Sequence, residues 1–219
     1  MVGTATPIPI SSVVGLAGCT LLLVSVVMTA ARSRRYSLTT RRLLFFSVFV
    51  VAFLPLQGLS MAGYVRGVTG DVSVTTLILL VAASISCLMD RDLYDSRSFL
   101  VLMLLILGGG VFLYPFALGL TYFDPYALGY GSKAFVAVLF LLSLGAWYFD
   151  LYLIVACVIF AISAYMIGIY ESTNLWDYLI DPLITSYALF LLAGNEIKHL
   201  LHGFSSGARS PLTRKASVR

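Results

Sequence analysis

Long apolar runs alternate with short polar segments along the whole chain. A membrane-spanning helix takes about 20 consecutive apolar residues, and most of the runs have about this length. The longest run, 134–169, contains one charged residue, Asp150. As one helix it would be about 54 Å long, against roughly 30 Å of hydrocarbon in a bilayer, so we divide it at a turn near Asp150. The pattern then predicts seven spans, at about 8–31, 43–63, 72–89, 99–118, 134–149, 151–169 and 182–195.

The composition supports a membrane protein. Hydrophobic residues make up 60% of the chain, charged residues 11%, and the mean hydropathy is +0.97. A soluble domain has about 25% charged residues, and the polar segments here are shorter than the roughly 50 residues of a small domain. We therefore expect an all-α, polytopic integral membrane protein. Residues 1–204 would form a single transmembrane helical domain, and residues 205–219 a basic, flexible cytoplasmic tail.

Positive charge is unevenly distributed between the two predicted sides. Five arginines lie in segment 32–42, directly after a first run that is too long for a cleaved signal peptide and has no basic region before it. By the positive-inside rule this segment is cytoplasmic, so the N-terminus lies outside. Seven spans then place twelve of the fourteen Lys and Arg residues inside, together with the C-terminus. We expect a multi-pass protein of the bacterial inner membrane or the plasma membrane, with membrane lipids as partners.

The loop before the last span holds three carboxylates between two apolar runs. Ser172 or Thr173 could cap a short helix there. On such a helix Asn174, Asp177 and Asp181 share one side. Carboxylates four residues apart repel each other, so a cation is expected beside them.

Polar residues also occur in the loops after the second and fourth spans. Arg66 and Lys133 are the basic residues predicted on the outer side, and Asp71 with Ser73 could cap the third span. These loops lie at the same end of the bundle as the acidic loop, which predicts one outer site. Its candidate ligand-binding residues are Arg66, Asp71, Asp124, Tyr126, Glu171, Asn174, Trp176, Asp177 and Asp181. The alternative is that the aromatic residues form an interfacial belt and the acids are ordinary solvated loop residues.

Several classes of function are disfavoured. No ionisable residue lies in the middle of a predicted span, which argues against a proton pump and a retinal protein. His199 and His202 lie together in the C-terminal segment, which excludes an intramembrane haem held by paired histidines, and two ligands are too few for zinc. Cys19, Cys87 and Cys157 lie within apolar runs and are interpreted as packing residues. We expect no metal, no cofactor and no nucleic-acid partner.

Four functions remain open. A transporter-like protein would bind or move a polar small molecule, ion or lipid headgroup, through a cavity that continues past Gly109. A membrane enzyme acting on a lipid-linked headgroup would place Arg66 near a carboxylate in a closed pocket. A non-catalytic subunit would dock a partner protein in the membrane or at its outer face, and a sensor would signal through its tail. No catalytic motif of recognisable spacing is present, so we favour the first reading and a protein without enzymatic activity.

Overall fold

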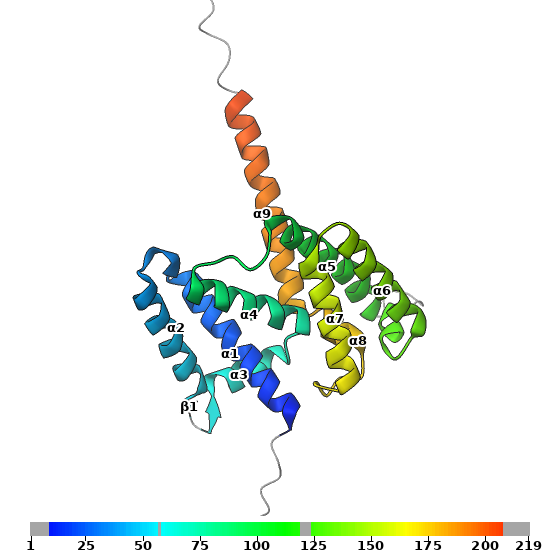
Figure 1. The fold of residues 1–219 in the computed structure, drawn as a ribbon, viewed down its shortest axis with the longest axis horizontal. Helices are drawn as coiled ribbons and strands as arrows, with labels where there is room; N and C mark the ends of the chain where they lie inside the picture. Colours follow the sequence, from blue (N-terminus) through cyan, green and yellow to red (C-terminus); the bar gives the residue numbers. More distant parts are fainter. Residues whose placement is uncertain (1–8, 57, 119–123, 208–219) are drawn as a thin grey trace, which may run out of the picture.

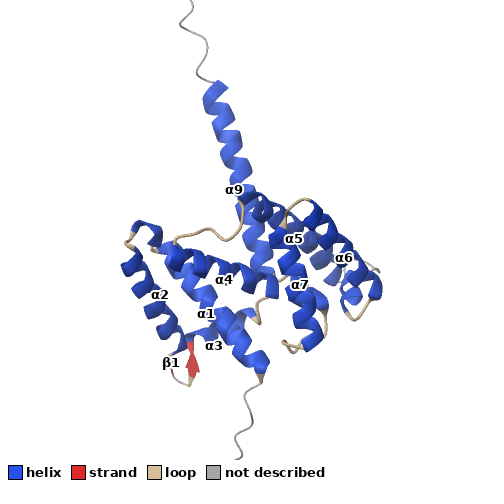
Figure 2. Cartoon of the chain, viewed as in Figure 1, coloured by secondary structure: helices blue, strands red, loops and turns tan. Residues whose placement is uncertain are grey.

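The computed structural model describes residues 9–56, 58–118 and 124–207, and within them the chain is all-helical apart from one two-residue hairpin (Figures 1 and 2). The all-α prediction is therefore confirmed. The long helices are α1 (Ile10–Ala30), α2 (Leu38–Phe53), α4 (Val74–Met89), α5 (Ser96–Ala117), α6 (Lys133–Tyr148), α7 (Tyr152–Ile167) and α9 (Pro182–Gly207). The short elements are η1 (Ser33–Arg35), β1 (Pro55–Leu56), β2 (Leu59–Ser60), α3 (Met61–Thr69), η2 (Pro125–Gly129) and α8 (Leu175–Leu179).

Polar residues between the apolar runs determine where the long helices begin. Ser37, Ser73, Asp95 and Ser132 each accept a hydrogen bond from a backbone N–H in the first turn of α2, α4, α5 and α6, respectively. Such caps satisfy donors that have no partner within the helix. Ser73 thus caps α4, as predicted, whereas Asp71 does not.

The predicted second span, 43–63, is wrong as a single helix. α2 begins earlier, at Leu38, and ends at Phe53, because Leu54 precedes Pro55 and is extended. A short hairpin then pairs Pro55 with Ser60, and the segment predicted as an outer loop forms helix α3. At the other end of the chain α9 continues to Gly207, beyond its predicted end at 195 and into the predicted tail, of which residues 208–219 lie outside the described residues.

α1, α2, α7 and α9 run steeply up or down the view, whereas α4 lies nearly across it (Figure 1). α1 begins at the lower end of the view, α9 projects from the upper end, and the turns after α1, α4 and α6 lie at the upper end. α4 packs against both α1 and α7, α5 against α9, and α6 against α7. One large apolar core is formed by side chains from α4, α5, α6, α7, α8 and α9. A smaller core of Val24, Met28 and Phe45 lies between α1 and α2.

The glycine triplet of α5 allows close packing against the chain around α9. A Cβ atom on Gly109 would lie 2.6 Å from the δ-methyl of Ile180, and one on Gly110 would collide with the side chain of Thr185. Gly108 has no such neighbour. Two of the three glycines therefore have a packing role.

Two helices in the described part of the chain, Ile10–Ala30 and Ser96–Phe116, are long and apolar enough to cross a membrane. The other apolar helices are shorter. Many large apolar side chains are exposed, among them Phe140 and Leu141 on α6 and Phe160 on α7.

Candidate functional site

The segment that connects α7 to α9 is built around Asn174. This residue is the N-cap of α8, where its Oδ1 accepts a hydrogen bond from the backbone N–H of Trp176 at 2.9 Å. Its Nδ2 donates to the carbonyl oxygen of Tyr126, and the Trp176 indole donates to that of Pro125. Asn174 is completely buried, and the Trp176 ring packs on Phe135. Both were predicted to bind a ligand, but both instead fasten η2 to this segment, and neither Ser172 nor Thr173 is the cap.

Tyr178 holds the same segment from the inside. Its buried hydroxyl donates to the carbonyl oxygens of Tyr170 and Ser172 and accepts from the Tyr170 N–H. These contacts fix the backbone on both sides of Glu171.

Asp181 joins two helix N-termini. Its Oδ1 accepts from the Ile184 N–H in the first turn of α9. Its Oδ2 accepts from the Ser73 N–H and the Thr76 hydroxyl, at the start of α4. A carboxylate is favourable at these positive helix ends. Asp181 is 6% exposed and therefore has a structural role. It does not share a helix face with Asp177, because α8 ends at Leu179 and Ile180 is extended.

Arg66 is paired with Asp71. The Arg66 Nε and Nη2 donate to the two carboxylate oxygens at 2.6 and 3.1 Å, and this bond raises the pKa of Arg66. The pair rests on α1 at Gly15, where a Cβ atom would collide with both side chains. The carboxylate beside Arg66 is thus that of Asp71, from the turn that follows α3. Lys133 is exposed and makes no ion pair within the described residues.

A cavity of about 340 Å³ lies between η2, the C-terminal end of α5 and the segment before α9. It brings together five of the nine predicted residues, Asp71, Tyr126, Glu171, Asp177 and Asp181. Arg66 reaches it through Asp71, and Asn174 and Trp176 do not line it. Asp124 is exposed and caps η2 by accepting the Tyr126 N–H.

Asp177 and Glu171 are the carboxylates of this cavity that neither pair with an arginine nor cap a long helix within the described residues. Asp177 accepts hydrogen bonds from the hydroxyls of Tyr126, at 2.9 Å, and Ser172, at 2.5 Å. Burial, reinforced by the bond to Asp177, raises the pKa of Tyr126, so its hydroxyl stays protonated. Glu171 is exposed and has one long contact, 3.4 Å from the Ser11 hydroxyl. A carboxylate has about four acceptor sites, so both retain capacity for a further donor.

Tyr170 is a lining residue of the cavity that was not among the predicted site residues. It is 6% exposed, it lines the cavity, and its hydroxyl has no hydrogen-bond partner in the described part of the chain. Burial raises its pKa, with the carboxylates of Asp71 and Asp181 adding to the effect, so this hydroxyl too is neutral. Leaving a buried hydroxyl without a partner costs about 1–3 kcal/mol. The sequence did place Tyr170 directly before Glu171. A tyrosine at that position was equally well explained as part of an interfacial aromatic belt.

Apolar side chains form the floor of the cavity. Leu113 and Ile180 line it, and Ile180 also lines an apolar cavity of about 220 Å³ that includes Gly109. Because the Ile180 side chain packs onto Gly109, it stands between the polar and the apolar cavity. Among the described residues, no three His, Cys, Asp or Glu side chains come together as a metal site.

The chain matches no family model, and no curated protein and no solved structure is detectably similar to it.

Proposed function

We propose that the chain is a polytopic membrane protein whose long helices α1, α2, α4, α5, α6, α7 and α9 cross the bilayer, with the N-terminus outside and the C-terminus cytoplasmic. The 16-residue helices rise about 24 Å, a little less than the roughly 30 Å hydrocarbon core. The exposed apolar side chains of α6 and α7 suit contact with lipid. Trp147 and Tyr148, exposed at the end of α6, have the character of an interfacial belt.

At its outer end the protein binds a small organic cation, such as a protonated amine or a quaternary ammonium group, without covalent chemistry. The observation that carries this proposal is that the carboxylates of Glu171 and Asp177 line the same cavity as three tyrosines, Tyr114, Tyr126 and Tyr170. Arg66 forms its ion pair with Asp71 and acts on Glu171 only from a longer distance, so Glu171 and Asp177 have no ion-pair partner within the described residues. A cleft lined by one sign of charge attracts the opposite charge.

The aromatic residues of the cavity are suited to the same ligand. The rings of Tyr114, Tyr126 and Tyr170 line it, and a tyrosine ring attracts a cation over its face.

Binding is favoured over transport. A transport pathway would continue from the carboxylates past Gly109, but Ile180 occupies that position and the space beyond it is lined almost entirely by apolar residues. Binding is also favoured over catalysis. A membrane enzyme would use Arg66 to hold a substrate phosphate, but the Arg66 guanidinium group already donates to both carboxylate oxygens of Asp71.

A thermal-unfolding screen of the detergent-purified chain tests this proposal. Tetramethylammonium and ethylammonium should raise the melting temperature, and myo-inositol and inorganic phosphate should not, because a ligand stabilises the state that binds it. The stabilisation should be lost in Glu171→Gln and kept in Asp150→Asn, which removes an exposed carboxylate at the opposite end. Stabilisation by myo-inositol alone would contradict the cation proposal and indicate a neutral polyol as the ligand. Equal stabilisation of Glu171→Gln and the wild type by the ammonium compounds would show that Glu171 is not part of the site.

A further inference from the structure

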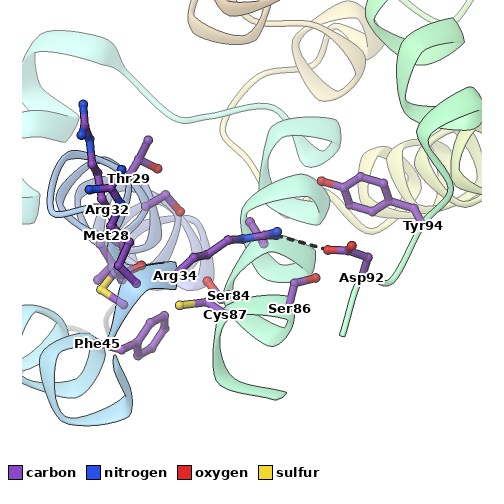
Figure 3. Close-up of a pocket in the computed structure, with 15 residues that line it drawn as sticks. Met28, Thr29, Arg32, Arg34, Phe45, Ser84, Ser86, Cys87, Asp92 and Tyr94 are labelled. Carbon is purple, nitrogen blue, oxygen red and sulfur yellow. Dashed lines mark hydrogen bonds and ion pairs between the residues drawn. The ribbon is translucent and has the colours of Figure 1, made fainter. Parts of the chain in front are cut away.

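A second cavity, of about 400 Å³, lies at the opposite end of the bundle (Figure 3). It lies between two parts of the chain: the turn between α1 and α2, and the end of α4 with the segment that follows it. Its lining combines two kinds of residue. Arginines from η1 and its N-cap lie at the rim, and Met28, Phe45 and Cys87 lie at the apolar floor.

The rim is strongly basic. Arg32, Arg34 and Arg35 all line the cavity, against one acid, Asp92. Arg34 extends across the opening and donates to Asp92 at 3.2 Å (Figure 3). Both side chains of this pair are about three-quarters exposed, and such pairs are weak because water screens them. An incoming anion can therefore take the place of Asp92 on Arg34 without a large loss.

Neutral hydrogen-bonding groups face the same opening. Ser86 lines the cavity from α4, and Tyr94 lines it from the segment before α5. The hydroxyl of Ser84, which also lines it, already donates to the Leu80 carbonyl oxygen. An anionic oxygen accepts hydrogen bonds from hydroxyls as well as from arginines, and a phosphate offers several such oxygens. The guanidinium group in particular matches phosphate geometry, since it can bind two oxygens at once.

We infer that this cavity binds the headgroup of an anionic phospholipid, with the phosphate on Arg34 and Arg35 and the start of the acyl chains against Phe45 and Met28. A soluble phosphate compound would use the arginines but has no need of an apolar floor. The inference rests on the proposed membrane orientation, which puts this end of the bundle at the cytoplasmic leaflet, where anionic lipids attract basic groups. It does not depend on the outer cation site.

Native mass spectrometry of the full chain in detergent tests the inference. Phosphatidylglycerol and phosphatidylcholine with the same acyl chains are titrated against the wild type. Arg34→Gln combined with Arg35→Gln should weaken phosphatidylglycerol binding by about tenfold or more and leave phosphatidylcholine binding unchanged. Arg91→Gln combined with Arg97→Gln is the matched control, because it removes the same charge from exposed positions at the same end outside the cavity. Asp92→Asn should strengthen binding, since it frees Arg34.

A second measurement uses the native thiols and needs no variant. Cys87 lines the cavity, whereas Cys19 and Cys157 are buried elsewhere. Phosphatidylglycerol should slow maleimide labelling of Cys87 relative to phosphatidylcholine. Equal labelling in the two lipids, or an equal loss of binding in both arginine pairs, would overturn the proposal. Full competition by millimolar inorganic phosphate would overturn the lipid assignment in favour of a soluble phosphate.

Discussion

The carboxylate of Asp181 accepts a hydrogen bond from the backbone N–H of Ser73 at 2.8 Å, across 108 residues of sequence. This bond and the one to Ile184 fasten the N-termini of α4 and α9 to each other beside the outer cavity. Asp181 is thus a support for the site, and its neighbour Asp177 is a better candidate for contact with a ligand.

Replacing Asp181 by Ala should destabilise the protein by about 2–4 kcal/mol, because the cap of α9 and the bond from Thr76 are lost and the buried Ser73 N–H is left without a partner. Thermal unfolding in detergent measures the change. Asp150→Asn is the control, since Asp150 is exposed and has a positive φ that Asn adopts readily. A melting temperature for Asp181→Ala equal to that of the control would contradict the structural role.

The glycines of α5 predict opposite effects at two neighbouring positions. Gly110→Ala should destabilise by about 1–3 kcal/mol, because the new methyl group collides with Thr185. In Gly108→Ala the new methyl group has no neighbour within 4 Å among the described residues. This variant should therefore stabilise the protein by about 0.5–1 kcal/mol, because alanine has the higher helix propensity. Comparison of the two melting temperatures checks the packing role, and equal shifts would contradict it.

Removal of Arg66 should lower stability and raise cation affinity. Arg66→Ala leaves Asp71 unpaired at the cavity, which costs about 1–2 kcal/mol but adds one negative charge beside the ligand. Lys133→Ala should change neither quantity, because Lys133 is exposed and outside the cavity. A binding titration with tetramethylammonium on the two variants measures the effect, and weaker binding by Arg66→Ala would mean that Arg66 itself contacts the ligand.

The tyrosines of the cavity predict a loss of stability in alkali. Burial raises the pKa values of Tyr126 and Tyr170 above the ordinary 10.0 in the folded state. Above pH 10 the unfolded chain releases these protons while the folded chain retains them, so the free energy of unfolding falls as pH rises. The double variant Tyr126→Phe, Tyr170→Phe should show a shallower fall than Tyr148→Phe, which changes an exposed tyrosine. Equal slopes in urea unfolding at several alkaline pH values would refute this account.

The helices could be predicted from the sequence better than their boundaries. The long helices coincide with the apolar runs, because burial in lipid or core imposes long stretches without charge. The end of α2 at Phe53 was missed, although Pro55 carried the signal, and so was helix α3, whose polar sequence was interpreted as a loop. Local composition says little about a short helix that is held in place by packing against α1.

The site could be located from the sequence, but the roles of its residues could not. Clustering of acids and aromatics between apolar runs predicted one site, and five of the nine predicted residues do line one cavity. Which side chain faces the cavity depends on tertiary contacts. Asn174 and Trp176 turn toward η2, and Tyr170 turns inward. The direction of each side chain depends on how helices that are dozens of residues apart pack together. Residue spacing within one segment does not contain this information.

The most direct test of the central claim is a calorimetric titration of tetramethylammonium into the detergent-purified chain, with Glu171→Gln combined with Asp177→Asn as the comparison. Loss of two carboxylates from the cavity should weaken binding by about tenfold or more, equivalent to roughly 1.4 kcal/mol. Asp150→Asn should bind as the wild type does. Unchanged affinity in the double variant, with its melting temperature preserved, would show that the outer cavity is not a cation site.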